Sequence, residues 1–256
     1  MKTVVYRRLG RLACLLAWAW LGGCAQVPAH NPLAHWVPSP NHDIRRPVLI
    51  VLHATEQRSA QASLDTLRTR NSGGPVSAHY LIGSDGTIYQ LVADEQRAWH
   101  AGAGRWGTIT DVNSASLGIE LDNDAQSPYT AAQIDSLLRL LNDLTTRWRI
   151  PRTQIIGHED LAPNRKSDPG LLFPWQQLAD AGFGLWPRLP LIDPPPGFDP
   201  WMALGAIGYP LDRRDAAIRA FHRHFRGIDG DALDAQDLRL LYALSRQLNG
   251  ETTAAP

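Results

Sequence analysis

A loop rich in glycine and proline carries the side chains of this sequence that best suit metal chemistry. It runs from Gly157 to Gly170 and holds His158, Lys166 and Asp168. Because its glycines and prolines oppose a regular helix or strand, we expect an ordered loop. The histidine and the aspartate are ten positions apart, so they could share one metal ion if a third ligand came from elsewhere.

His53 is the obvious donor of that third ligand. It follows the apolar run 47–52, which begins with proline and is typical of a buried strand. Two imidazoles and one carboxylate suit a catalytic zinc, which takes three protein ligands and keeps a fourth position open. Non-haem iron oxygenases use the same set, so the ligands alone leave the metal undecided.

Six short blocks are informative together because of their residue types and their order. They are Val51–Thr55, Ser77–Ile82, Ser84–Gln90, Ala98–Gly102, Ser116–Glu120 and the loop 157–170. In this order they resemble the zinc-dependent N-acetylmuramoyl-L-alanine amidases of the amidase-2 type, and most closely the AmiD-like lipoproteins of that family. Phage lysozyme-like amidases and peptidoglycan recognition proteins are related to the same family. The resemblance covers roughly residues 45–180.

The resemblance implies a reaction and the residues that perform it. One Zn²⁺ would be held by His53, His158 and Asp168, with Glu120 as the general base and Lys166 supporting the oxyanion. The substrate would be peptidoglycan or muropeptides, cut at the amide between the muramic acid lactyl group and L-alanine during cell-wall turnover. The alternative is a peptidoglycan-recognition protein without catalysis. Such proteins typically lack a metal ligand, whereas all three candidates are present here.

The segment 116–122 predicts a strand with a carboxylate in an unusual place. Leucine and isoleucine occupy alternate positions, and Gly118 and Glu120 face the other side. A glutamate within an apolar strand needs a partner or a role, and burial would raise its pKa towards the range of a useful general base. The glycine leaves room above the carboxylate. The alternative is a surface charge on an edge strand.

Four further residues are candidates for substrate contact. A hairpin is predicted from 78–82 and 87–92, and its first strand carries His79 and Tyr80 on opposite faces. The resemblance puts this hairpin beside the substrate groove, although His79 could equally be a structural histidine with its bonds satisfied. Trp99 and His100 lie on a glycine-rich loop and suit contact with sugar and peptide.

The elements between these residues alternate in type. We expect a surface helix over 59–70, a helix that opens with a capping box at Thr130 and Gln133, and a short strand over 154–156 that delivers His158. The predicted fold is α/β, with a central mixed β-sheet flanked by helices over residues 47–182. An iron oxygenase would instead need the many short strands of a jelly roll, which argues against that class.

The C-terminal part predicts a second, helical unit. Residues 183–200 are rich in proline and indicate a linker, and residues 201–250 have the apolar periodicity of three helices. This unit resembles the small helical peptidoglycan-binding modules, and the alternative is an extension that only packs on the first domain. His222 and His224 are two positions apart on a helix, so they would make a poor metal pair.

The N-terminal part indicates export. Residues 1–23 have a basic start and a short apolar run, as a lipoprotein signal peptide has, and Leu21-Gly22-Gly23-Cys24 resembles a lipobox in which Cys24 is lipidated. An ordinary secretory signal is the alternative. We expect a tether over 24–46 and a periplasmic protein anchored to the outer membrane. The 25 basic residues balance 25 acidic ones, so no nucleic-acid partner is expected, and we expect a monomer.

Overall fold

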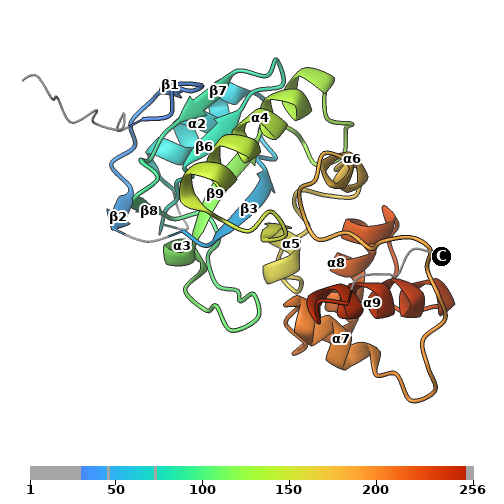
Figure 1. The fold of residues 1–256 in the computed structure, drawn as a ribbon. Helices are drawn as coiled ribbons and strands as arrows, with labels where there is room; N and C mark the ends of the chain where they lie inside the picture. The colour runs from blue at the N-terminus through green and yellow to red at the C-terminus, as the bar shows by residue number, and fades with distance from the viewer. Residues whose placement is uncertain (1–29, 45–46, 72–73, 252–256) are drawn as a thin grey trace, which may run out of the picture.

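The computed structural model describes residues 30–44, 47–71 and 74–251 (Figure 1). A six-stranded mixed sheet forms its centre, in the order β1-β7-β6-β9-β3-β10. Its strands are β1 (His35–Trp36), β3 (Leu49–Ala54), β6 (Tyr80–Ile82), β7 (Ile88–Gln90), β9 (Ser116–Leu121) and β10 (Ile155–Gly157). The strands pair in parallel except for β6 with β7, which form the predicted antiparallel hairpin. The predicted α/β fold with a central mixed sheet is confirmed.

Strand β3 is buried along its whole length because each face of the sheet is covered by a different set of helices. Ile50 and Leu52 belong to the cluster beneath helix α4 (Ala131–Trp148), together with the leucines of that helix. Leu49 and Val51 point to the other face and join a cluster built largely by the C-terminal helices. Because side chains alternate along a strand, His53 lies on the face that α4 does not cover.

Helix α4 begins as the sequence predicts, but only half of the expected capping box forms. The Thr130 side chain accepts a hydrogen bond from the backbone N–H of Gln133. The Gln133 amide turns to the sheet instead and donates to the carbonyl oxygens of Ile82 and Asp122, at 2.9 and 3.3 Å. The helix start is therefore joined to the ends of β6 and β9.

Smaller helices connect the strands and build the C-terminal part. Helices α2 (Ala60–Arg68), capped by Ser59, and α3 (Val112–Ala115) lie between strands, and α5 (His158–Leu161) and α6 (Trp175–Asp180) follow the last strand, β10. The three helices predicted at the C-terminus are present as α7 (Pro200–Ile207), α8 (Arg214–Arg226) and α9 (Ala235–Leu248). None of the helices in the described part of the chain combines the length and apolarity needed to cross a bilayer.

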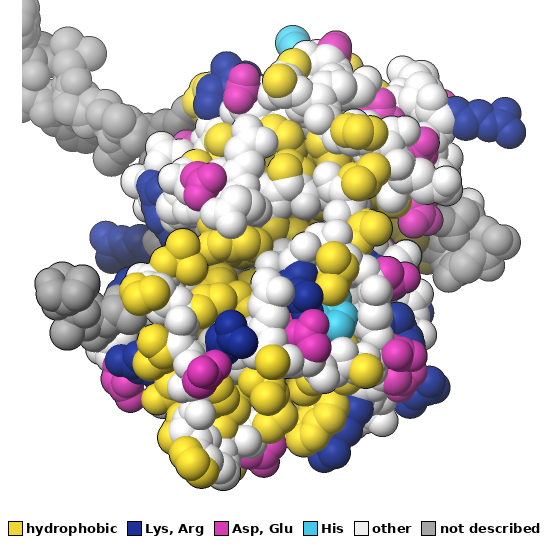
Figure 2. Space-filling model, turned by 90° about the vertical axis from the view of Figure 1, so that its right-hand side faces the viewer, with side chains coloured by type: hydrophobic (Ala, Val, Ile, Leu, Met, Phe, Trp, Pro, Cys, Tyr) yellow, Lys and Arg dark blue, Asp and Glu magenta, His cyan; other side chains and the backbone are white. Residues whose placement is uncertain are grey.

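The C-terminal helices, which we call the helical module (residues 200–248), share a hydrophobic cluster with the sheet. Leu204, Phe221 and Leu241 are fully buried in the same cluster as Leu49 and Val51. Figure 1 shows α5 between the sheet and this module, and Figure 2 shows that the surface is continuous across the junction, with hydrophobic side chains exposed on both parts. The module therefore packs directly on the first domain.

The prediction of a tether up to residue 46 is wrong for its second half. Strand β1 pairs in parallel with β7, and β2 (His42–Ile44) pairs antiparallel with β8 (Gln96–Ala98). The buried Asn31 donates its backbone N–H to the side-chain oxygen of Gln90 at 2.7 Å. Strands of two or three residues are too short to show a periodicity, so the sequence could not reveal them. The expected signal peptide and Cys24 lie outside the described residues.

Candidate metal centre

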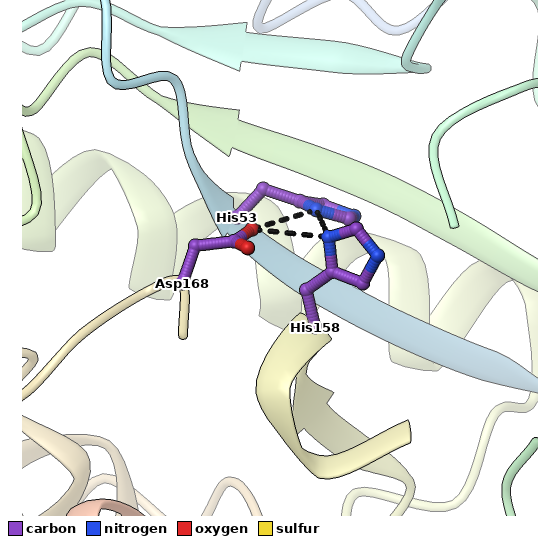
Figure 3. Close-up of side chains that lie close together, drawn as sticks. All are labelled: His53, His158 and Asp168. Atoms are coloured by element: carbon purple, nitrogen blue, oxygen red, sulfur yellow. Dashed lines mark hydrogen bonds and ion pairs between the residues drawn. The ribbon is translucent and has the colours of Figure 1, made fainter. Parts of the chain in front are cut away.

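Three segments far apart in the sequence bring the predicted ligands together (Figure 3). His53 lies near the end of β3, and His158 is the first residue of α5, directly after β10. Because β3 and β10 are neighbouring parallel strands, both histidines reach the carboxyl edge of the sheet, where α/β folds build their sites. Asp168 comes from the following loop. One turn of helix, α5, interrupts the stretch that the sequence predicted to be loop throughout.

The three ligand atoms form a tight, buried triangle. The Nδ1 atoms of His53 and His158 are 3.0 Å apart, and each lies 3.1 Å from Oδ2 of Asp168. The three residues are 2 to 4% exposed. Two ligand atoms on a tetrahedral zinc, each at about 2.0–2.1 Å, are about 3.3 Å apart, so these separations suit such an ion. Within the described residues, this is the group of three that could hold a metal.

A chain of hydrogen bonds fixes the tautomer of His53. Its Nε2 lies 3.0 Å from Nδ1 of His100, and His100 Nε2 lies 3.2 Å from the Ser116 hydroxyl oxygen. That hydroxyl donates to the carbonyl oxygen of Val112 at 2.6 Å, so it accepts from His100. His100 therefore presents an unprotonated Nδ1 to His53, and His53 donates from Nε2. Its Nδ1 keeps a lone pair for the site.

His158 reaches the same state through the backbone. Its Nε2 lies 2.8 Å from the carbonyl oxygen of Ala101 and must donate to it. Arg165 donates to the same oxygen and to the carbonyl oxygen of Ala103, both at 2.7 Å, and so holds this loop in place. The sequence reasoning missed Arg165, because nothing in the pattern connects it to a loop more than sixty positions earlier.

The arrangement therefore points three acceptor atoms at one another. Two imidazole lone pairs and a carboxylate oxygen repel at 3.0 to 3.1 Å unless a cation or a proton lies between them. Burial, together with His158, lowers the pKa of His53 to about 4, which favours neutral imidazole, the form that binds metals. The donor set and its geometry fit a divalent ion such as zinc.

Glu120 lies next to the ligands, on the strand beside His53. The two residues are register partners in β9 and β3, and both side chains line one cleft of about 170 Å³. Burial, and secondarily Asp168, raises the pKa of Glu120 to about 8. The carboxyl group therefore holds its proton to an unusually high pH, although a bound cation would lower that pKa. The alternative of a surface charge on an edge strand is wrong, because β9 lies between β6 and β3.

Gly118 leaves space on this face, as predicted, and the space is filled by His100. A Cβ atom at Gly118 would lie 2.4 Å from Cγ of the His100 ring. Lys166 lines the same cleft, with its side chain 37% exposed and its ammonium nitrogen 4.0 Å from Oδ1 of Asp168. It therefore brings a positive charge within ion-pair distance of a candidate ligand inside the cleft.

Two of the four predicted substrate contacts are wrong. His79 is fully buried, with Nδ1 accepting the backbone N–H of Gly118 at 3.0 Å and Nε2 donating to the Gln96 carbonyl oxygen at 2.9 Å. Tyr80 is also fully buried and donates its hydroxyl to Asp94 at 2.6 Å. Both side chains are structural, because the hairpin carrying them is covered on each face.

The other two predicted contacts, Trp99 and His100, do line the cleft. His100 has a second feature that the sequence did not reveal, namely its contact with Nε2 of His53. In the sequence, only the glycine at position 118 indicated this contact. It showed that a large side chain could pack there, but not which one.

A site of two histidines and one carboxylate at the carboxyl edge of a mixed α/β sheet, with a half-buried glutamate beside it, is the arrangement that zinc hydrolases use. Comparison with known proteins then gives the family. Residues 43–171 match the Amidase_2 family, described as N-acetylmuramoyl-L-alanine amidase, and the chain belongs to this family.

Two curated relatives illustrate the range of the family. The chain is 39% identical to N-acetylmuramoyl-L-alanine amidase AmiD of Escherichia coli K12 over 155 residues, which cover 54% of this chain and 54% of that protein. It thus spans about half the length of this relative. It is 35% identical to 1,6-anhydro-N-acetylmuramyl-L-alanine amidase AmpD of Enterobacter cloacae, over 56% of this chain and 87% of AmpD.

Solved structures match a larger share of the chain. A complex of E. coli AmiD with the substrate anhydro-N-acetylmuramic acid-L-Ala-D-gamma-Glu-L-Lys covers 89% of this chain and 94% of its own, with a TM-score of 0.68 and 31% identity. AmpDh3 of Pseudomonas aeruginosa in complex with anhydromuramic pentapeptide covers 86% and 99%, with a TM-score of 0.71 and 31% identity. Both matches extend beyond the sheet domain.

Proposed function

We propose that this protein is a zinc-dependent N-acetylmuramoyl-L-alanine amidase that cuts the amide between the muramic acid lactyl group and L-alanine. The observation that carries the proposal is the convergence of His53 Nδ1, His158 Nδ1 and Asp168 Oδ2, with Glu120 on the neighbouring strand of the same cleft. Three acceptors without protons of their own call for a cation, and membership of the amidase-2 family supports zinc as that cation. The ligand number leaves one position open, as catalytic zinc requires.

Glu120 and Lys166 have distinct roles in amide hydrolysis beside the metal. When bound, zinc supplies a Lewis acid that polarises the scissile carbonyl and lowers the pKa of water to about 7. Glu120 takes the proton of the attacking water and passes it to the leaving amine, a contribution on the order of 10²- to 10⁴-fold in rate. Lys166 places a positive charge where the oxyanion develops, which typically contributes about 3 to 4 kcal/mol.

The substrate is peptidoglycan or its soluble muropeptides. Support comes from the two structural neighbours that are complexes with anhydromuramic peptides. The cleft, of about 170 Å³, extends from the candidate ligands past Trp99 and Thr55 to helix α2, so its walls continue beyond the reacting centre. A recognition protein without catalysis is disfavoured, because the ligands, Glu120 and Lys166 are all in place.

Digestion of defined muropeptides tests the proposal. We expect the purified chain from residue 25 to release stem peptides, seen by mass spectrometry, to lose this activity with a chelator and to regain it with zinc. Glu120→Ala should still bind one zinc and release nothing. Glu95→Gln, at an exposed position, is the matched control and should behave as the wild type. Full activity in metal-free protein, or in the Glu120 variant, would remove zinc or the glutamate from the mechanism.

We also propose that the protein is a lipoprotein of the periplasm, anchored to the outer membrane through Cys24. The support is the lipobox-like Leu21-Gly22-Gly23-Cys24 after a basic and apolar start, with alanine rather than aspartate at position 25. Mass spectrometry of the mature N-terminus should find an acylated cysteine, and Cys24→Ala should release the protein from the membrane fraction. An unmodified terminus at another position would contradict the anchor.

A further inference from the structure

The one-turn helix α5 carries two buried acidic residues directly after the ligand His158. Glu159 and Asp160 are both fully buried. Adjacent buried carboxylates are costly to a fold unless each is paired or hydrogen-bonded. Their partners therefore matter to the position of α5, and most of those partners come from the helical module.

Asp160 is held by three groups. Its Oδ1 accepts the hydroxyl of Tyr209 at 2.6 Å, and its Oδ2 lies 2.8 Å from Nδ1 of His224. The backbone N–H of Gly157 donates to Oδ2 at 2.7 Å. Tyr209 and His224 belong to the helical module, and the ring of His224 stacks on Trp175 with centroids 3.7 Å apart and an angle of 9°.

Glu159 depends on the module even more. Arg223 Nη1 lies 3.3 Å from its Oε2, and this is the only side-chain partner that the described part of the chain provides for the carboxylate. Arg223 is 16% exposed and is itself fixed by Asp229 at 3.1 Å. A buried acidic group with a single side-chain partner follows that partner closely, because separation would leave the group buried without its hydrogen bond.

The backbone of α5 joins these contacts to both ligands of the loop. His158 is bonded covalently to Glu159, and the backbone N–H of Glu159 donates to the carbonyl oxygen of Asp168 at 2.9 Å. His53, in contrast, is fixed by β3 within the sheet. A displacement of α5 would therefore move two ligands relative to the third.

We propose that the helical module positions the metal centre: Arg223 acting on Glu159, and Tyr209 with His224 acting on Asp160, hold α5 so that His158 and Asp168 meet His53. Neither the arginine nor the tyrosine lines the cleft that holds the candidate ligands. They are positioning residues, and the inference rests on the proposed metal-dependent function.

Metal affinity tests this proposal without reference to catalysis. Zinc dissociation constants are measured on metal-free full-length protein by competition with a chromophoric chelator, and Co²⁺ loading reports ligand geometry through its visible absorption. We expect Arg223→Met to weaken zinc binding about 10- to 100-fold, the usual effect of losing a residue that orients ligands, and to change the Co²⁺ spectrum. Adding Glu159→Gln replaces the buried acidic group that has lost its partner with a neutral amide of the same shape, and it should restore affinity to within about threefold of the wild type.

A matched control lies on the same helix. Arg219 pairs with Asp215 and Asp231, both within the module, so Arg219→Met should leave zinc affinity and the Co²⁺ spectrum unchanged. Tyr209→Phe is a smaller change that removes only the hydroxyl on Asp160, and it should weaken zinc binding about 3- to 10-fold. If the Arg223 variant does not fold, the zinc affinity of Tyr209→Phe tests the positioning role on its own.

The outcomes separate this inference from the proposed function. Wild-type affinity and spectrum in both Arg223→Met and Tyr209→Phe would overturn the positioning role and leave the metal site intact. A wild-type protein that binds no zinc would overturn the proposed function itself, before any variant is compared.

Discussion

Glu120→Gln should stabilise the metal-free protein at alkaline pH. Burial raises the pKa of Glu120 from 4.5 to about 8, so the folded protein holds this proton where the unfolded chain has lost it. The wild type therefore has its full stability below pH 4.5 and loses part of it as pH rises towards 8. Glutamine has no proton to lose, so the difference in unfolding free energy should grow over this range and level off above pH 8.

The size of the effect follows from the same pKa. A change from 4.5 to about 8 corresponds to about 5 kcal/mol at about 1.36 kcal/mol for each decade. Water in the open cleft screens the charge, so we expect about half of this, roughly 2 kcal/mol. In the metal-loaded protein the difference in unfolding free energy between Glu120→Gln and the wild type should be smaller, because a cation beside Glu120 favours its ionised form.

Urea unfolding at pH 5 and pH 9, on protein freed of metal with a chelator, measures this difference. Glu95→Gln, at an exposed position, controls for the loss of one charge and should follow the wild type at both pH values. If the unfolding free energies of Glu120→Gln and the wild type run in parallel from pH 5 to 9, the carboxyl group is not desolvated, and our reasoning about its proton is wrong.

Three further predictions concern other parts of the site and the core. Gly118→Ala should displace the His100 ring and weaken zinc binding about 10- to 100-fold in a chelator competition, whereas Gly205→Ala, whose Cβ would meet only ordinary contacts, should not. Lys166→Met should lower kcat about 10²- to 10³-fold with zinc still bound, and Lys166→Arg should retain more of the rate than methionine; equal rates for the methionine variant and the wild type would exclude an oxyanion role. Leu241→Ala should cost about 2 to 5 kcal/mol, and calorimetry should still show one transition, since a separate melting of the module would contradict the shared core.

The sequence pointed to the three candidate metal ligands because two of them follow apolar strands. His53 and His158 each end or follow a run of aliphatic residues, and the parallel pairing of those runs brings the two imidazoles together. Glu120 was marked by its place in an alternating strand. The fold class was predictable for the same reason, because the spacing of apolar residues in a long segment indicates both the type of element and which of its faces is buried.

The roles of the other histidines could not be predicted from the sequence. His79 and His100 both lie in short segments next to aromatic residues, and only the pairing of β6 with β9 decides that one is sealed in the interior while the other reaches His53. Likewise, the sequence alone indicates only that Glu159 and Asp160 are two acidic residues on a loop. Their partners lie 49 to 64 positions away, and no local pattern identifies contacts over such distances.

The hydrophobic cluster shared by β3 and the helical module has a consequence for how this chain can be divided. The proline-rich stretch near residue 183 separates the two parts in chain order only, because Leu49 and Val51 are sealed by side chains that come after it. A fragment that ended there would expose the hydrophobic face of the sheet to water. If the helices were fused to another enzyme, that enzyme would need a complementary hydrophobic surface to pack against them. In this protein the strand that carries His53 and the C-terminal helices share one hydrophobic core, so neither part can be removed without exposing the other.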